Sequence, residues 1–132
     1  MRLITKQTDY AIRILGSMAG GSDAVHTTTE LAEKLKISKP FVRAIMQKLN
    51  KERIIFSTKG KGGGFRMATE PDQISIVSLI NIFQGPVKLD DCLIRKSVCP
   101  EVKTCPLKKK LQDIGCYINE EFKDLTLDKI LK

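Results

Sequence analysis

A basic, glycine-rich turn separates two strand-like runs in the segment RIIFSTKGKGGGFRMA, residues 53–68. Residues 54–58 and 65–68 contain the branched and aromatic residues that strands prefer, and KGKGGG between them can reverse the chain. We therefore expect an antiparallel hairpin with a cationic tip. The segments before and after it follow the period of a helix, so the predicted fold class is mainly α with one small β-hairpin.

Three helices are predicted ahead of this hairpin. Thr5 can cap the first, and Thr27 can cap a short second helix as the start of a capping box. Ser38 can cap the third, with Pro40 in its first turn, where proline is tolerated. Two short helices joined tightly and followed by a hairpin are the arrangement of a winged helix-turn-helix, in which the helix before the hairpin enters the major groove of DNA.

The distribution of charge favours a polyanionic partner. The net charge is +8, and residues 1–70 contribute +7 of it, with 13 of the 23 Lys and Arg but only 6 of the 15 Asp and Glu. Such a basic half is typical of a surface that meets nucleic acid. The alternative is an exposed hairpin whose lysines serve only solubility.

The side chains expected at DNA lie in the first turn of the third helix and along the hairpin. Arg43 is suited to bidentate reading of guanine, whereas the lysines are expected to contact phosphates. The glycines at positions 60 and 62–64 would let the backbone of the hairpin approach DNA closely. The predicted set is Ser38, Lys39, Pro40, Arg43, Lys59, Lys61 and Arg66.

Residues 1–85 are predicted to form the DNA-binding domain, which closes with a helix that a glycine and a proline terminate. Residues 86–132 then contain a loop, a long helix that begins near Pro106 and a short terminal helix. Apolar residues recur along the long helix at steps of three and four, and this stripe must pack on the first domain or pair with a second copy. A homodimer is favoured, since two-fold dimers are the commonest oligomers. The stripe consists of Leu107, Leu111, Ile114, Ile118, Phe122 and Leu125.

All four cysteines lie within residues 92–116. Cys92, Cys99 and Cys105 are separated by six and five residues, which matches neither zinc knuckles nor thioredoxin-like redox sites. Wide gaps suit a loop around an iron-sulfur cluster, whose irons take thiolate ligands. On a continuous helix Cys116 would lie about 16 Å along the axis from Cys105. We therefore expect Cys116 to pack in the core or in a dimer contact.

Several function classes are disfavoured by the sequence. No apolar run is long enough to span a bilayer, and the amino terminus lacks the pattern of a signal peptide, so a cytoplasmic location with reduced thiols is expected. No histidine lies near a cysteine in the sequence, which argues against an enzyme with a cysteine nucleophile. His26, the only histidine, is expected to be a solvated loop residue, with metal ligation as the alternative.

A family resemblance is carried by three spaced cysteines together with five stretches: TDYAIRIL, ISKPFVRAIMQKL, KGKGGGFRMA, FQGP and LTLDKIL. Together they resemble the Rrf2 family of bacterial transcription regulators, which includes IscR and NsrR, over essentially the whole chain. The resemblance implies a homodimeric winged helix-turn-helix protein, crossed by a long dimerisation helix, that binds promoter DNA at a palindromic site. It also implies that DNA affinity depends on an iron-sulfur cluster bound by Cys92, Cys99 and Cys105.

The fourth ligand distinguishes members of that family. IscR-like members carry a histidine three positions after the last cysteine, and this chain has Lys108 there. Some NsrR-like members use an aspartate of the first helix, supplied by the opposite subunit, and Asp9 matches that position. The alternative role for Asp9 is a carboxylate stabilised by the helix dipole.

Three thiolates and one oxygen ligand favour a 4Fe-4S cluster over a 2Fe-2S cluster. The function expected is therefore transcription regulation in response to nitric oxide, redox or iron status. Two alternatives stay open: a cluster-free, thiol redox-responsive regulator of the same fold, and a zinc-stabilised adaptor.

Overall fold

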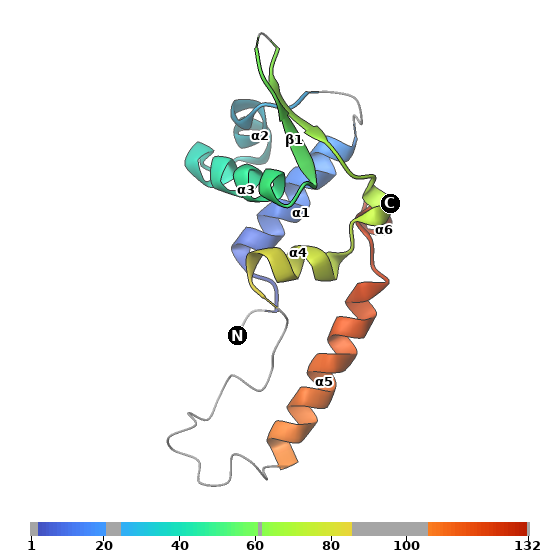
Figure 1. The fold of residues 1–132 in the computed structure, drawn as a ribbon. Helices are drawn as coiled ribbons and strands as arrows, with labels where there is room; N and C mark the ends of the chain where they lie inside the picture. The colour runs from blue at the N-terminus through green and yellow to red at the C-terminus, as the bar shows by residue number, and fades with distance from the viewer. Residues whose placement is uncertain (1–2, 21–24, 61, 86–105, 132) are drawn as a thin grey trace.

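The computed structural model describes residues 3–20, 25–60, 62–85 and 106–131 (Figure 1). Within these residues it contains six α-helices, one 3-10 turn and a two-stranded antiparallel sheet, which confirms the mainly helical class with a hairpin. The elements are α1 (Lys6–Ala19), α2 (Thr28–Leu35), α3 (Lys39–Lys51), β1 (Ile55–Thr58), β2 (Gly64–Met67), η1 (Pro71–Gln73), α4 (Ile76–Phe83), α5 (Pro106–Lys123) and α6 (Leu127–Ile130). None of the helices described is long and apolar enough to cross a membrane.

The helix starts follow the capping residues of the sequence. The side chains of Thr5, Thr27 and Ser75 each accept a hydrogen bond from the backbone N–H three residues later, which satisfies a donor that a helix start leaves without a partner. Ser38 also precedes a helix, but its hydroxyl makes no capping bond. The backbone N–H groups at the start of α3 therefore make no hydrogen bond to the Ser38 side chain and can donate to another acceptor.

The core lies around α1, which contacts α2, α3, α4 and β2, and α3 also contacts β1 (Figure 1). Each helix contributes the apolar residues that recur at helical spacing, so the pattern that predicts the helices also places their buried sides. The largest fully buried side chains are Ile14, Leu15, Met18, Leu31, Val42, Met46, Leu49, Ile55, Ile76, Leu79, Ile80 and Leu127.

The turn between α2 and α3 depends on Lys36. This residue ends α2 in the left-handed conformation, with φ of 56°. That conformation costs a residue with a Cβ roughly 1 kcal/mol. The N–H of Ile37 donates to the carbonyl of Ala32 at 3.1 Å, and α3 begins at Lys39. The connection is thus the short one that a helix-turn-helix requires.

The hairpin matches its predicted position to within one residue at each strand. Ile55 pairs with Met67 and Phe56 with Arg66, so alternate residues face the core. His26, expected in a solvated loop, instead joins the sheet. Its N–H donates to the carbonyl of Phe65 at 2.9 Å, and the N–H of Phe65 donates back at 2.8 Å. The expectation of a solvated side chain is wrong, because His26 is half-buried and its Nε2 is enclosed, with no hydrogen-bond partner among the described residues.

The carboxyl-terminal segment returns to the turn that precedes α4. Ser75 and Thr126 form a second isolated bridge, and the N–H of Leu127 donates to the carbonyl of Ile74 at 2.8 Å. Leu127 is fully buried in the core. The far end of α5 is therefore tied to the turn that precedes α4.

The apolar stripe of α5 divides into two parts. Its later residues, Ile118 and Phe122, pack against the core, as does Leu125, which lies just beyond the end of α5. Its early residues are open to solvent in the single chain, with Leu107 54% and Ile114 39% exposed. Figure 1 shows this early half of α5 extending away from the body of the molecule.

Cys116 lies on α5, which continues through Gly115 without a break. Its side chain is exposed, so it is not part of the core of this chain. It follows Ile114 by two positions and therefore projects from nearly the opposite side of the helix. A dimer contact along the stripe would leave Cys116 outside it.

Candidate nucleic-acid interface

The helix α3 presents one apolar and one polar side. Val42, Ile45, Met46 and Leu49 are buried against the core. Lys39 and Arg43 lie four positions apart on the exposed side, one above the other along the helix. All four DNA contacts predicted for this helix are exposed: Ser38, Lys39, Pro40 and Arg43.

The wing, which we define as β1, β2 and the turn between them, lies directly beside α3 (Figure 1). Lys59 is exposed at its tip, and Lys61 lies outside the described residues. Arg66, predicted to contact DNA, is half-buried in β2, and its Nε is enclosed with no hydrogen-bond partner among the described residues. Arg66 therefore contributes to the body of the wing as well as to its charge.

The wing glycines serve two different purposes. Gly60 and Gly62 have φ of 96° and 75° with open space around them, so they permit the turn itself. A Cβ on Gly64 would lie 2.7 Å from the carbonyl oxygen of His26, and one on Gly63 would lie 2.5 Å from that of Thr58. A side chain at Gly63 or Gly64 would therefore collide with the protein's own backbone. This internal packing explains both glycines without a close approach to DNA.

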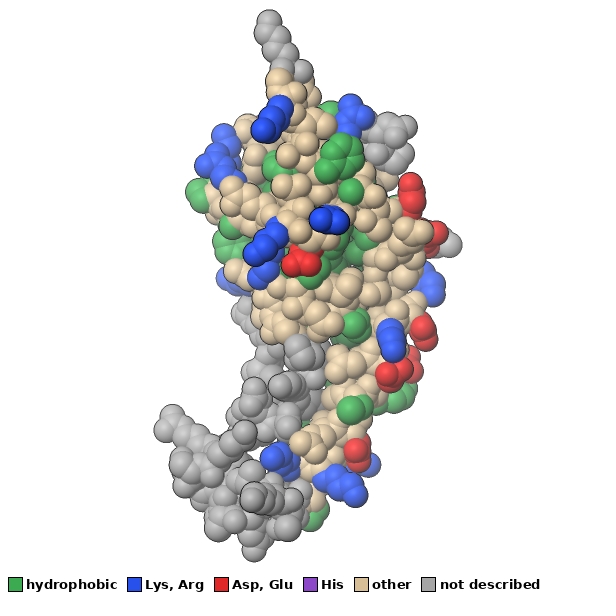
Figure 2. Space-filling view, in the orientation of Figure 1, with side chains coloured by type: hydrophobic (Ala, Val, Ile, Leu, Met, Phe, Trp, Pro, Cys, Tyr) green, Lys and Arg blue, Asp and Glu red, His purple; other side chains and the backbone are tan. Residues whose placement is uncertain are grey.

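Positive charge collects on this end of the molecule. Figure 2 shows Lys and Arg side chains over the part that contains α2, α3 and the wing, acidic side chains beside η1, and a mixture of basic and acidic side chains along α5. Within the described part of the chain, neither Lys39 nor Arg43 forms an ion pair. Their charges are therefore available to a polyanion.

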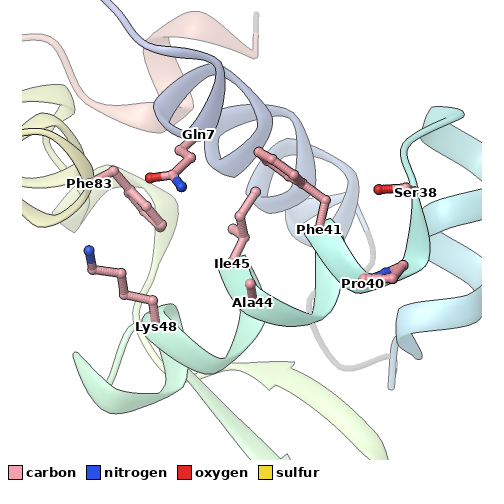
Figure 3. Close-up of a pocket in the computed structure, with 8 residues that line it drawn as sticks. All are labelled: Gln7, Ser38, Pro40, Phe41, Ala44, Ile45, Lys48 and Phe83. Atoms are coloured by element: carbon pink, nitrogen blue, oxygen red, sulfur yellow. The ribbon is translucent and has the colours of Figure 1, made fainter.

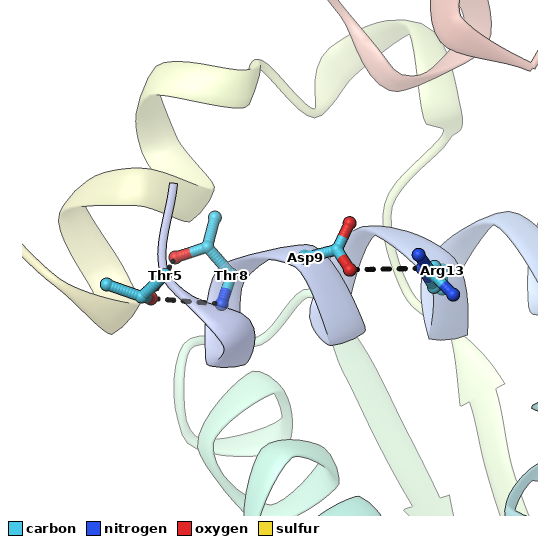
Figure 4. Close-up of polar contacts among 4 residues, drawn as sticks. All are labelled: Thr5, Thr8, Asp9 and Arg13. Atoms are coloured by element: carbon cyan, nitrogen blue, oxygen red, sulfur yellow. Dashed lines mark hydrogen bonds and ion pairs between the residues drawn. The ribbon is translucent and has the colours of Figure 1, made fainter. Parts of the chain in front are cut away.

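Asp9, the candidate oxygen ligand, lies in the first turn of α1 (Figure 4). Its Oδ2 lies 3.1 Å from the Nε of Arg13, and its side chain is 46% exposed. The position near a helix start agrees with dipole stabilisation. The exposure also leaves the carboxylate accessible to a second subunit, so both roles are physically open to it.

Three of the candidate cluster ligands, Cys92, Cys99 and Cys105, lie outside the described residues. Among the residues that the structure does describe, no three His, Cys, Asp or Glu side chains gather closely enough to hold a metal ion. Pro106, the residue after Cys105, is the first residue of α5. The candidate ligands therefore precede directly the helix whose early half is unpacked.

Comparison with known proteins shows the family. The family model described as "Rrf2: Iron-dependent Transcriptional regulator" matches residues 4–132. This chain belongs to the Rrf2 family. It is accordingly a DNA-binding transcriptional regulator of the Rrf2 type and not an enzyme.

Individual relatives agree with this assignment. An Aquifex aeolicus protein named as an HTH-type transcriptional regulator is 32% identical to this chain. The match covers 92% of this chain and 86% of the relative. The HTH-type transcriptional regulator NsrR of Shouchella clausii is 28% identical over 96% of this chain and 89% of its own. The solved structure of CymR (YrzC), the global cysteine regulator of B. subtilis, superposes with a TM-score of 0.80 at 20% identity and covers 99% of this chain and 97% of that one.

Proposed function

We propose that this Rrf2 regulator is a cytoplasmic homodimer whose affinity for a palindromic promoter site is set by an iron-sulfur cluster. The observation that carries the DNA-reading part is the exposed first turn of α3, with two unpaired cations and an uncapped helix start beside the wing. In this proposal residues 1–85 read DNA, and residues 86–132 hold the cysteines and the dimer helix.

DNA recognition would use the start of α3. Its free amide donors and the hydroxyl of Ser38 suit a phosphate oxygen, because a helix N-terminus attracts anions. Lys39 is close to the same phosphates, and Arg43 lies one turn deeper, where its planar guanidinium can bind the O6 and N7 of guanine. Lys59, Lys61 and Arg66 of the wing would contact the DNA backbone and position α3 without specifying sequence.

The dimer would form through the exposed half of the α5 stripe. Leu107 and Ile114 are exposed in the single chain, and Leu111 between them is half-buried. Covering such a stripe with the same stripe of a second copy satisfies two-fold symmetry. The early half of α5 then lies at the dimer interface, immediately after Cys105.

The donor set fits an iron-sulfur cluster. Three thiolates select iron-sulfur chemistry over the hard cations that prefer oxygen. The carboxylate of Asp9 is exposed on α1 and can be offered to a partner subunit. A 4Fe-4S cluster held by Cys92, Cys99 and Cys105 of one subunit and Asp9 of the other would supply a centre that reacts with nitric oxide, oxidants or iron shortage.

A mechanical connection from the cysteines to α3 is supported by the packing. The start of α5 follows the cysteines, and its later residues Ile118 and Phe122 pack on the core that also holds α3. The segment after α5 is hydrogen-bonded to the turn before α4 through Leu127, the first residue of α6. A change at the start of α5 would therefore alter how the two copies of α3 are spaced, and spacing decides the fit to two half-sites.

The test begins with protein isolated without oxygen. Native mass spectrometry should show a dimer whose mass includes iron and sulfide. The promoter site is selected from random duplexes with this protein, and its affinity is measured before and after exposure to nitric oxide. We expect a loss of at least about ten-fold, or 1.4 kcal/mol. Equal affinity before and after exposure contradicts cluster control and leaves DNA reading intact.

A second candidate function is a thiol-responsive regulator of the same fold without a cluster. It is favoured by the similarity in fold to CymR, a cysteine regulator, and by a chain with four cysteines. Iron and acid-labile sulfide analysis separates the two functions, because only the first predicts both elements in stoichiometric amounts. If both are absent and thiol oxidation changes promoter affinity, the second function is correct.

A further inference from the structure

A hollow of about 400 Å³ lies beside α3, on the side next to α1 and α4 (Figure 3). Small-molecule sites in proteins measure roughly 300–1,000 Å³, so the hollow has room for a small ligand. Its lining comes from three helices and from the residue that precedes α3: Gln7, Ser38, Pro40, Phe41, Ala44, Ile45, Lys48 and Phe83.

The chemistry of the hollow is divided between its two ends. Figure 3 shows the ammonium of Lys48 and the amide of Gln7 together beside the ring of Phe83, with Phe41 and Ile45 farther along. The Nζ of Lys48 lies 5.4 Å from the centroid of the Phe83 ring, which holds the charge over the hollow by a cation–π contact. The side chains of Lys48 and Gln7 have no hydrogen-bond or ion-pair partner within the described residues.

We propose that this hollow binds a small amphipathic anion, with a carboxylate against Lys48 and Gln7 and an apolar body along Phe41, Ala44 and Ile45. A cation without a counter-charge at the edge of an apolar site favours a ligand that carries one negative charge. Charge complementarity selects an anion over a neutral molecule, and the apolar walls select an organic body over a bare phosphate.

The ligand would act on DNA recognition, a consequence that rests on the proposed function. Ser38 and Pro40 belong both to the hollow and to the predicted DNA contacts. A ligand seated there occupies the side of the first turn of α3 and restricts how closely a duplex can approach. The site would thus connect a metabolite to promoter binding independently of the cysteines.

The test measures binding to the full chain without DNA. The probes are 3-phenylpropionate and its neutral amide, 3-phenylpropionamide, followed by calorimetry or ligand-observed NMR. We expect the acid to bind about five-fold more tightly than the amide, as for a partly exposed ion pair. Lys48→Met should remove this preference. Lys51→Met is the matched control, because it removes the same charge from the same helix away from the hollow, and it should leave the preference unchanged.

A second variant tests the location. Ala44 is exposed, so Ala44→Phe can fill the hollow without disturbing the core, and it should abolish binding of both probes. Equal binding of acid and amide, equal effects of Lys48→Met and Lys51→Met, or no binding of either probe overturns the proposal. A change of oligomeric state in Ala44→Phe without probe binding would identify a second copy as the occupant and also overturn it.

The two proposals fail separately. Because the probes are measured without DNA, a chain that binds the acid but no selected promoter refutes the proposed function alone. A chain that binds its promoter but shows no preference for the acid refutes the ligand site alone.

Discussion

The carboxylate of Asp9 and the guanidinium of Arg13 face each other across one turn of α1, with 3.1 Å between Oδ2 and Nε. Both side chains are largely exposed, so their attraction is weakened by water and salt. The pair therefore leaves Asp9 free to change partner at small cost, which is what an aspartate shared with a second subunit requires.

Asp9→Asn should separate a structural role of this carboxylate from ligation. Loss of the exposed pair should reduce the free energy of unfolding by no more than about 0.5 kcal/mol, measured by urea denaturation of the cluster-free protein. If the proposed cluster forms, the same change should shorten the lifetime of its absorbance in nitric oxide or air. Arg13→Gln breaks the same ion pair and should not shorten it. Equal cluster lifetimes for the two variants would assign Asp9 to the ion pair and the helix dipole alone.

Gly64→Ala should damage the wing from inside. The new Cβ would meet the His26 carbonyl and the Val25 side chain, each at 2.7 Å, and backbone must shift to relieve this. We expect a loss of about 1–3 kcal/mol in unfolding free energy, with weaker promoter binding. Gly20→Ala is the control, since its Cβ would meet nothing closer than 3.7 Å. A Gly64→Ala variant as stable as the control would contradict the close packing of residues 25–26 on β2.

Lys36→Gly should stabilise the protein. Glycine adopts the left-handed conformation without the steric cost that a Cβ brings, so the unfolding free energy should rise by about 0.5–1 kcal/mol. Lys34→Gly, two positions earlier inside α2, should lower it by about 1 kcal/mol. The opposite signs of two identical substitutions, measured by thermal or urea unfolding, are the diagnostic result. A destabilised Lys36→Gly variant would show that the lysine side chain contributes contacts beyond the turn.

Local signals predicted most of the fold, because caps and helical periods act over three or four residues. Thr5 and Thr27 cap the helices expected after them, and the hairpin falls within one residue of its predicted strands. The bridges of His26 to Phe65 and of Ser75 to Thr126 were not predicted. An isolated bridge joins only one pair of residues that lie far apart in the sequence, so it produces no repeating hydrophobic pattern from which it could be predicted.

Local signals likewise predicted only part of the candidate site. The exposed residues of α3 follow from the burial of Val42 and Met46, since a helix with one side in the core presents the other to solvent. The hollow beside α3 depends on Gln7 and Phe83, which come from opposite ends of the domain, and only the tertiary arrangement brings them together. The internal role of Gly64 has the same origin.

Ile114→Glu should weaken the homodimer that we propose forms through α5. Ile114 is 39% exposed on the early half of α5, and a carboxylate buried in a two-fold contact would meet its own copy at close range. Sedimentation velocity should show a larger monomer fraction at the same protein concentration. Cys116→Glu is the matched control, because it adds the same charge on nearly the opposite side of the same helix and should leave the monomer fraction unchanged. Equal effects of the two substitutions would place the dimer contact elsewhere.

Arg43 and Lys59 should differ in how they contribute to DNA binding. Arg43 lies on the exposed side of α3 one turn after its start, and Lys59 lies at the tip of the wing. We therefore expect Arg43 to reach a base edge and Lys59 to contact phosphates. Arg43→Met should cost about 1–3 kcal/mol on the selected promoter, and it should reduce discrimination against a substituted guanine. Lys59→Met should weaken selected and random duplexes alike, and the slope of log affinity against log salt should become shallower by about one. Fluorescence anisotropy at several salt concentrations measures both effects. If Arg43→Met weakens random DNA as much as the selected site, Arg43 contacts only the backbone, and sequence must be read by other residues of α3.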